Sequence, residues 1–352
     1  MWVGMDVLRR DPAVLRGKRV GLLSHQAAVC ADGASSAQAL RETLGDRLVA
    51  LFGPEHGFFG LAGPGEHTHS LQHPDWGIPV YSLYGELRKP SAEMLRGIDT
   101  LVFDLQDLGI RCYTYLGTLK LTMEACAECG VELVVADRPV PMPGLVDGPV
   151  AEPEYFSFVA PCALPMVYGM TPGETAQWLA ERMDRPPRLT VVPLEGEDFS
   201  DWVRGSDWPE FIPPSPGIKS WEAARTYPAT VFTEALTAVD CGRGTNMAFR
   251  VLGAPWLRAE EFCRRAVDRL GEFGLSAHPY RYTPESGQYA GQELDGIRLT
   301  IVDRRSYRPI SASYVLMERL VAEYGKERVL SGWRPEWLNK LYGCDEAKRF
   351  EV

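Results

Sequence analysis

The stretch Leu48-Val49-Ala50-Leu51-Phe52-Gly53-Pro54-Glu55-His56-Gly57-Phe58 decides how the fold of this sequence is interpreted. Its first five residues form an apolar run, as in strands that are buried on both faces of a sheet. The turn that follows carries two groups able to transfer protons, Glu55 and His56. Because glycine opens backbone angles closed to other residues and proline fixes one dihedral, this turn would hold both side chains rigidly, as catalysis requires. A turn in which Glu55 caps a helix and His56 packs locally is the structural alternative.

Similar apolar runs recur through the first half of the chain and alternate with helix-like segments. The runs cover residues 20–24, 48–52, 80–83, 100–104 and 132–136, and the clearest helices are 36–44 and 118–129. This alternation predicts parallel crossovers and therefore a Rossmann-like, doubly wound, mostly parallel α/β sheet. Polar residues follow most of the runs, and open α/β sheets bind ligands at the carboxyl ends of their strands. We therefore expect one edge of the sheet to carry Ser24, Glu55, Asp104 and Asp137.

The chain is long enough for two domains. Its 352 residues exceed what one core usually organises, and residues 208–217 are rich in proline, which is typical of a passage between lobes. We expect the α/β domain to span residues 1–207. A smaller α+β C-terminal domain that closes the cleft should span residues 208–352.

The charge balance limits the class of partner. The chain has 37 Lys and Arg residues against 47 Asp and Glu residues, a formal net charge of -10. This balance argues against nucleic acid or an anionic membrane surface and favours a small ligand or neutral polymer. No apolar stretch is long enough to cross a bilayer, and the N-terminal residues lack the pattern of a signal peptide. With eight scattered cysteines, the expected location is the cytoplasm, unless a leader has been removed.

The sequence predicts neither a metal nor another cofactor. His67, His69 and His73 could be read as a metal cluster, but no carboxylate or thiolate stands at a suitable spacing. Cys126 and Cys129 form a single C-x-x-C within a predicted helix, without a second pair to complete a zinc site. Nucleotide and serine-hydrolase signatures are also missing from the sequence.

Several motifs, which span nearly the whole chain in order, carry a resemblance to a known family. They are residues 21–26 (GLLSHQ), 52–58 (FGPEHGF), 79–85 (PVYSLYG), 103–115 (FDLQDLGIRCYTY), 137–139 (DRP), 169–174 (GMTPGE), 214–216 (PSP), 242–245 (GRGT) and 253–256 (GAPW). In these motifs the chain resembles the bacterial exo-acting β-N-acetylmuramidases of peptidoglycan recycling. The resemblance implies a glycoside hydrolase that releases N-acetylmuramic acid from the non-reducing end of a peptidoglycan fragment.

The resemblance also implies where the site lies. The Glu-His pair would stand at the centre of a cleft between a Rossmann-like lobe and the smaller lobe. Three positions and one stretch depart from the usual family pattern: His25, Val140, Tyr168 and residues 234–242. The candidate substrate-binding residues are Ser24, Gln26, Asp104, Arg111, Tyr115, Arg138, Tyr168 and Arg243.

Glycosidic cleavage normally needs one carboxylic acid to protonate the leaving oxygen and a second group to supply or activate a nucleophile. Glu55 is the expected acid, and His56 would tune it or hold the sugar. Asp107 is the preferred partner, with Asp104 and Glu86 as alternatives. The acetamido group of the substrate can itself act as nucleophile, and one carboxylate would then orient it. Asp104 and Asp107 could instead serve the fold, by pairing with Arg111 or with backbone groups.

N-acetylmuramic acid carries a lactyl carboxylate, for which a guanidinium is the natural receptor. Arg243, between two glycines, is the first candidate and Arg138 the second, and Tyr115 offers a ring for a sugar face. Two other functions remain open at this stage. One is a catalytically silent sugar-binding relative, and the other is a hydrolase for another acetamido or acidic sugar.

Overall fold

The computed structural model describes residues 1–63, 65–196 and 211–350, and the chain divides into two units. The first unit comprises Met1–Gly109, Tyr113–Gly144 and Gly169–Pro216, and the second comprises Ile110–Cys112, Leu145–Tyr168 and Gly217–Val352. The boundary that we expected between residues 207 and 208 lies outside the described residues. A single cut in the sequence also differs from this division, because two early segments belong to the second unit.

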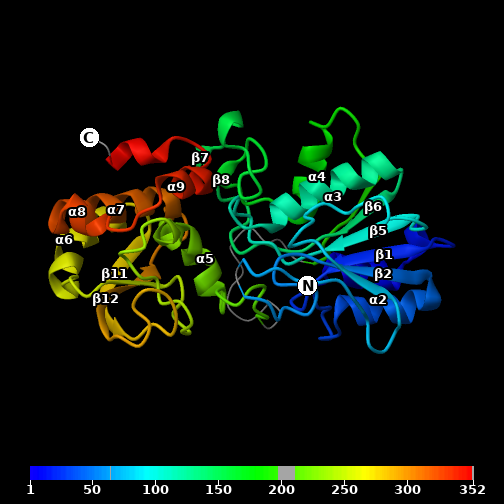
Figure 1. The fold of residues 1–352 in the computed structure, drawn as a ribbon, viewed down its shortest axis with the longest axis horizontal. Helices are drawn as coiled ribbons and strands as arrows, with labels where there is room; N and C mark the ends of the chain where they lie inside the picture. Colours follow the sequence, from blue (N-terminus) through cyan, green and yellow to red (C-terminus); the bar gives the residue numbers. More distant parts are fainter. Residues whose placement is uncertain (64, 197–210, 351–352) are drawn as a thin grey trace. The chain divides into compact units, whose positions relative to one another are not determined.

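A seven-stranded sheet in the order β3-β4-β2-β1-β5-β6-β9 organises the first unit (Figure 1). Neighbouring strands are parallel except for the edge pair of β3 with β4. Strands β1, β2, β5 and β6 are almost wholly buried, which explains their near-continuous apolar sequences. The bounds are β1 Val20–Ser24, β2 Leu48–Gly53, β3 Leu71–Gln72, β4 Pro79–Ser82, β5 Thr100–Asp104, β6 Glu132–Ala136 and β9 Leu189–Val192.

Helices cover both faces of this sheet, as in a doubly wound fold. Figure 1 shows α3 (Tyr115–Cys129) and α4 (Pro172–Ala180) on one face and α2 (Ser36–Leu44) on the other. Helix α1 (Gly4–Arg10) packs against α2, and its apolar residues join the core beneath the strands. Helix α4 begins with a capping box, since Glu174 and Thr171 exchange hydrogen bonds. The predicted α/β class is confirmed.

The strand order reverses direction between β1 and β5. From β1 the chain proceeds outward through β2 and β4, and it then returns to β5 and continues outward through β6 and β9. The loops that leave β1 and β5 therefore diverge at this point, which is where open α/β sheets bind their ligands. The site should be sought at the carboxyl ends of these central strands.

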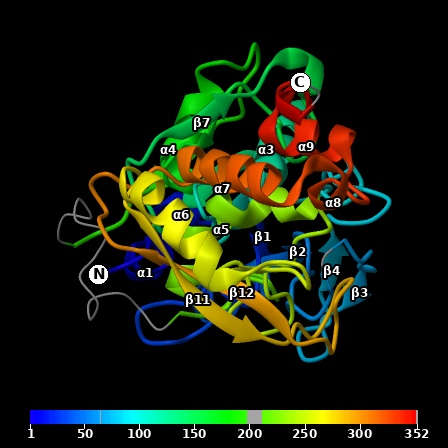
Figure 2. The same ribbon diagram turned by 90° about the vertical axis from the view of Figure 1, so that its left-hand side faces the viewer.

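The second unit combines a three-stranded antiparallel sheet, ordered β10-β12-β11, with several helices. Figure 2 shows α6 and α7 side by side, and α6 packs on both β11 and β12. A separate pair, β7 with β8, also belongs to this unit because Asp147 of β7 accepts hydrogen bonds from the first turn of α7. The bounds are β7 Asp147–Val150, β8 Pro165–Val167, α5 Trp221–Thr230, β10 Val251–Gly253, α6 Ala259–Gly271, β11 Leu275–Tyr282, β12 Leu294–Ile301, α7 Pro309–Tyr324, α8 Lys326–Val329 and α9 Pro335–Tyr342.

Short 3₁₀ helices complete both units, at Ala13–Leu15, Gly45–Arg47, Pro153–Tyr155, Val231–Glu234 and Glu346–Phe350. Within the ranges that the structure describes, none of the helices has the length and apolar character needed to span a membrane.

Candidate active site

Backbone contacts fix the shape of the turn that follows β2. Gly53 ends the strand so close to the returning chain that a Cβ there would lie 2.3 Å from the amide nitrogen of Phe58. The turn closes with a 2.9 Å hydrogen bond from the amide of Gly57 to the carbonyl of Pro54. Both Gly57 and His56 have positive φ angles, 77° and 70°. Because a non-glycine residue in this region is strained by on the order of 1 kcal/mol, the conformation of His56 marks a constrained site.

The ring of His56 is oriented by one hydrogen bond. Its Nδ1 lies 3.0 Å from the carbonyl oxygen of Ala62. A carbonyl only accepts, so Nδ1 must carry the proton and donate. Nε2 makes no hydrogen bond with the residues that the structure describes, although the residue is only 7% exposed. A buried imidazole with one fixed and one spare nitrogen is suited to contact a ligand.

Glu55 is buried and already contacts two donors. Its Oε1 accepts a 3.0 Å hydrogen bond from the amide of Gly65, and the hydroxyl of Tyr84 is also hydrogen-bonded to its carboxyl group. Burial and the charge of Glu55 raise the pKa of Tyr84 to about 12, so this phenol stays a neutral donor. Tyr84 follows β4 and was not among the candidate residues, although it lies in one of the motifs that carry the family resemblance.

Asp107 belongs to the same cluster as Glu55. Burial raises the pKa of Tyr113, and the charges of these two carboxylates raise it further, against hydrogen bonds with Ser215 and Tyr115 that lower it. The phenol of Tyr115 is shifted in the same direction, by burial first and by both carboxylates among its other causes. Asp107 is buried, and its Oδ1 accepts a 2.7 Å hydrogen bond from the amide of Leu108. Glu55 and Asp107 therefore both lie near the phenols of Tyr113 and Tyr115.

His25 connects the two diverging loops of the sheet. The amide of Gln106, after β5, donates to Nε2 of His25 at 2.9 Å, so the ring proton must sit on Nδ1. Nδ1 then donates to the hydroxyl of Tyr115 at 3.0 Å, and that hydroxyl donates to the carbonyl of Pro214 at 2.8 Å. Burial and the nearby Arg138 lower the pKa of His25 to about 3, which keeps the ring neutral. The hydroxyl of Tyr115 is thus occupied by two hydrogen bonds within the protein.

Gln26 keeps one polar atom spare. Its amide nitrogen donates to the carbonyl of Pro213 at 3.0 Å, while its buried Oε1 has no partner among the described residues. The side chain packs directly on Gly60, where a Cβ would lie 2.1 Å from its amide carbon. Ser24 is buried at the end of β1, in register with Asp104 of β5.

Asp104 and Arg138 form a buried ion pair. Both oxygens of Asp104 contact the guanidinium, through Nε and through NH2 at 3.1 Å. The same guanidinium donates to the carbonyl of Val29 at 3.0 Å and to the hydroxyl of Ser36 at 2.9 Å. The structural alternative for Asp104 therefore fits, but its partner is Arg138 and the idea that it pairs with Arg111 is wrong.

Arg111 lies in the second unit, fully buried, among backbone carbonyls. It donates to Pro149 and Leu164 at 2.9 and 2.6 Å, and to Leu341 and Tyr342 at the C-terminal end of α9. Burial lowers its pKa, and the negative end of the helix dipole offsets part of the charge. These contacts make Arg111 a structural residue of the second unit.

The other two substrate-binding candidates also lie in the second unit. Arg243 is partly exposed, pairs with Glu234 at 2.9 Å and lies over the ring of Phe249 at 5.2 Å. Tyr168 is buried just before the chain returns to the first unit.

Of the three histidines considered as metal ligands, His73 has other contacts. Nδ1 of His73 accepts from the amides of Asp75 and Trp76, and its ring stacks on Trp76 with 4.0 Å between centroids. Among the described residues, no group of three or more His, Cys, Asp or Glu side chains is arranged to hold a metal ion.

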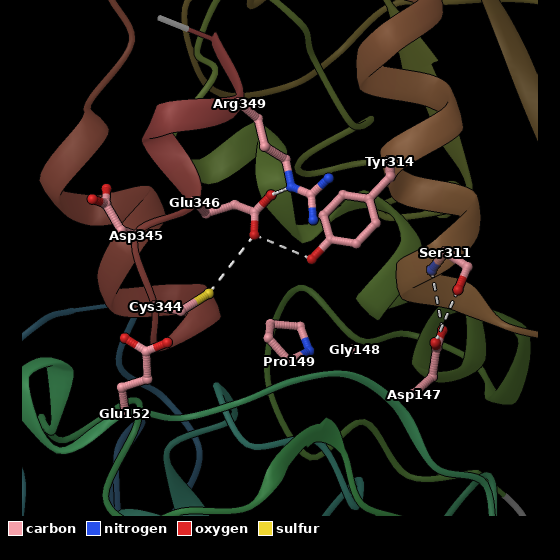
Figure 3. Close-up of a pocket in the computed structure, with 10 residues that line it drawn as sticks. All are labelled: Asp147, Gly148, Pro149, Glu152, Ser311, Tyr314, Cys344, Asp345, Glu346 and Arg349. Atoms are coloured by element: carbon pink, nitrogen blue, oxygen red, sulfur yellow. Dashed lines mark hydrogen bonds and ion pairs between the residues drawn. The ribbon is translucent and has the colours of Figure 1, made fainter.

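A cavity of about 550 Å³ lies wholly within the second unit (Figure 3). Several of its polar groups form hydrogen bonds or ion pairs with one another. Glu346 contacts Arg349 and accepts from the hydroxyl of Tyr314, and Asp147 accepts from the amide and hydroxyl of Ser311. The polar side chains that line the cavity therefore contact one another, as expected of residues that stabilise the local structure.

Comparison with known proteins identifies the family of the chain. The family model "Exo-beta-N-acetylmuramidase NamZ, N-terminal" matches residues 20–222, and the corresponding C-terminal model matches residues 225–350. The peptidoglycan beta-N-acetylmuramidase NamZ of Bacillus subtilis (strain 168) is 36% identical over 323 residues, which cover 90% of this chain and 76% of that protein.

Two solved structures, both DUF1343 family proteins from Bacteroides fragilis, share the fold. One superimposes with a TM-score of 0.89 at 33% identity, and the other with a TM-score of 0.78 at 26% identity. Each comparison covers 99% of this chain and 90% of the other. The chain belongs to the exo-β-N-acetylmuramidase family, and it is a glycoside hydrolase of that type.

Proposed function

We propose that this member of the exo-β-N-acetylmuramidase family releases N-acetylmuramic acid from the non-reducing end of peptidoglycan fragments, with Glu55 as the proton donor. The observation that carries the proposal is the strained turn after β2, which presents Glu55 beside Tyr84 and in one cluster with Asp107. A rigid carboxyl group at the carboxyl edge of a parallel sheet, with a second carboxylate nearby, is what glycosidic cleavage requires.

In the proposed reaction, the carboxyl group of Glu55 gives its proton to the glycosidic oxygen as the bond from that oxygen to the sugar C1 breaks. Water supplies the hydroxyl group that ends on C1, and its remaining proton restores Glu55. Asp107 either activates this water or orients the acetamido group that attacks C1 first. His56, fixed through Nδ1, offers Nε2 to the substrate.

Two groups are proposed to recognise the terminal sugar. The buried Oε1 of Gln26 can accept a hydrogen bond from a hydroxyl or amide group. The lactyl carboxylate is assigned to Arg243, which is partly exposed, in preference to Arg138, whose guanidinium is occupied by Asp104, Val29 and Ser36.

The cytoplasm is the proposed place of action. All eight cysteines are free, and most are buried. Reduced thiols of this kind are typical of proteins that work in a reducing compartment.

The test of the proton donor is Glu55→Gln, which keeps the shape of the side chain and removes the acid. General acid catalysis is typically worth ~10² to 10⁴ in rate, so cleavage of an N-acetylmuramide with a poor leaving group should fall by that factor. An activated aryl glycoside needs little protonation and should retain much of its bond-cleavage rate. Both rates are measured by product release under single-turnover conditions.

The matched control is Glu66→Gln in the same loop, where an exposed carboxylate accepts from the amide of Gly63. This variant should cleave both substrates at the parent rate. A folded Glu55→Gln protein that cleaves the poor-leaving-group substrate as fast as the parent would remove Glu55 from this role.

Arg243→Ala tests recognition of the lactyl carboxylate. Loss of a charge-assisted contact should weaken kcat/KM on an N-acetylmuramide by ~2 to 4 kcal/mol, and far less on a glucosaminide that lacks the carboxylate. Equal losses on the two substrates would instead mark Arg243 as a structural residue.

A further inference from the structure

The loop that presents Arg243 is fixed through its backbone. Gly242 and Gly244, on either side of the arginine, have positive φ angles of 75° and 88°. The carboxylate of Asp240 accepts from the amide of Gly242 at 2.6 Å, and the carbonyl of Arg243 accepts from the amide of Glu285 at 3.1 Å. These contacts hold the arginine in place independently of its side chain.

The guanidinium of Arg243 contacts an aromatic ring and a carboxylate. Its Cζ lies 5.2 Å from the centre of the Phe249 ring, which packs edge-on against Tyr227. Phe249 is buried and has a φ of 62°, a conformation that is strained for phenylalanine, so its ring is a fixed support. The carboxylate is that of Glu234, whose Oε1 accepts a 2.9 Å hydrogen bond from Nη2 of Arg243.

Glu234 occupies only part of the arginine. A guanidinium has five N–H donors, and the side chain of Arg243 uses one of them toward the residues that the structure describes. Since this side chain is 32% exposed, its other donors can reach a ligand. Arg334 donates to the backbone carbonyl of Glu234, and Arg243 is the residue that forms an ion pair with its carboxylate.

A ligand carboxylate at Arg243 would meet both charges of this ion pair. The guanidinium attracts it, and the carboxylate of Glu234 on the same guanidinium repels it at a similar distance. Because both side chains are partly buried, water and salt screen this repulsion less than at a fully exposed site. An uncharged group in the same place would not be repelled. Glu234 therefore reduces the advantage of a charged ligand over a neutral one.

We infer that Glu234 is a specificity-determining residue, which lowers the preference for a free lactyl carboxylate so that the site also accepts sugars with an uncharged lactyl amide. The inference rests on the proposed role of Arg243 as receptor of the lactyl group. Because the backbone of the loop is held by other residues, Glu234 acts through its charge rather than by positioning the arginine.

Two substrates that differ only in charge test the inference, an aryl N-acetylmuramide with a free lactyl carboxylate and its lactyl primary amide. Glu234→Gln keeps the shape and the acceptor for Arg243 but removes the charge. The KM for the acid should fall by ~10-fold, and the KM for the amide should change by less than about twofold. The kcat values should not change, because the charge lies away from the reacting bond. Initial rates give both constants.

The matched control is Glu318→Gln, which removes the same charge from an exposed pair with Arg269 in the same unit and should change neither KM. Glu234→Asp keeps the negative charge and should keep the parent ratio of the two KM values. A Glu234→Gln protein with the parent ratio, or with a raised KM for the acid, would overturn the inference. The same holds if Glu234→Asp changes the ratio as much as Glu234→Gln does, or if the parent cleaves the acid and not the amide.

Arg243→Ala separates this inference from the proposed function. It should raise KM for the acid and have far less effect on the amide. If it does so while Glu234→Gln keeps the parent ratio, the inference alone fails. If Arg243→Ala changes both substrates equally, recognition of the lactyl group by Arg243 fails, and the role of Glu234 fails with it. A parent protein that cleaves neither substrate would overturn the proposed function as a whole.

Discussion

Two parts of the same sheet edge differ in how far the fold uses their polar atoms. After β5 and β6, the side chains of Asp104, Arg138 and Asp137 are bound to one another or to neighbouring backbone and hydroxyl groups. After β1 and β2, Gln26 and His56 each keep one polar atom with no partner in the described part of the chain. Polar residues at one sheet edge are therefore not equivalent. The saturated side builds the scaffold, and the side with spare atoms is where we propose that a substrate binds.

Arg138→Met should cause the largest loss of folding stability on the saturated side of the sheet edge. It leaves the carboxylate of Asp104 buried without its partner, which typically destabilises a protein by about 3 to 5 kcal/mol. Denaturant unfolding measures this loss. Arg9→Met, which removes the exposed pairs with Asp32 and Glu42, is the control and should have a far smaller effect.

If Arg138→Met is no more destabilising than the control, the saturated side is not a scaffold. Replacing both partners, with Asp104→Leu and Arg138→Met together, should recover much of the lost stability, because no unpaired charge then remains.

Asp137 gives a pH-dependent test of the same side. Burial raises its pKa to about 6, against hydrogen bonds from the amide of Gly173 and the hydroxyl of Thr171. The folded chain therefore holds this proton more tightly than the unfolded chain. The stabilisation is fully present below about pH 4 and is lost as the pH rises through about 6.

The measurement is the free energy of unfolding of the parent minus that of Asp137→Asn, which cannot titrate. This difference should fall by about 3 kcal/mol between pH 4 and pH 7, since each unit of pKa shift corresponds to about 1.4 kcal/mol. A difference that is constant, or that grows with pH, would contradict the assignment.

Tyr115→Phe tests whether Tyr115 stabilises the fold or binds the substrate. The hydroxyl of Tyr115 accepts from His25 and donates to Pro214, so its removal leaves two buried groups unsatisfied, at about 1 to 3 kcal/mol. Stability should fall, while KM for an N-acetylmuramide should be unchanged. His25→Leu combined with Tyr115→Phe should cost less than the sum of the single changes. A raised KM with unchanged stability would instead return Tyr115 to the substrate-binding residues.

The sequence was sufficient for the fold of the first unit and for its central turn. The strands at residues 20–24, 48–53, 100–104 and 132–136 are buried on both faces, so their apolar runs are nearly continuous and stand out in the sequence. The turn that carries Glu55 is likewise a local feature, because its glycines and proline are what fix its shape. Local chemistry of this kind can be interpreted without knowledge of the distant chain.

Arg111 and Tyr84 show what could not be predicted. Arg111 follows Asp107 by four residues, which suggested an ion pair, yet it lies in the other unit and donates to backbone carbonyls. Carbonyl groups are common to every residue, so such a site has no sequence signature. Tyr84 contacts Glu55 through the approach of two separate loops, and neither loop alone indicates the pairing.

The contacts of Arg111 also impose an order on the synthesis of the molecule. The carbonyl of Tyr342 that completes its environment lies 231 residues further along the chain. During translation this guanidinium therefore cannot reach all of its carbonyl partners until α9 has been synthesised. The first unit is also interrupted, because its third segment begins only at Gly169. The two units are therefore not two consecutive stretches of sequence. A nascent chain stopped before α9 would expose the charge of Arg111, which the complete fold buries.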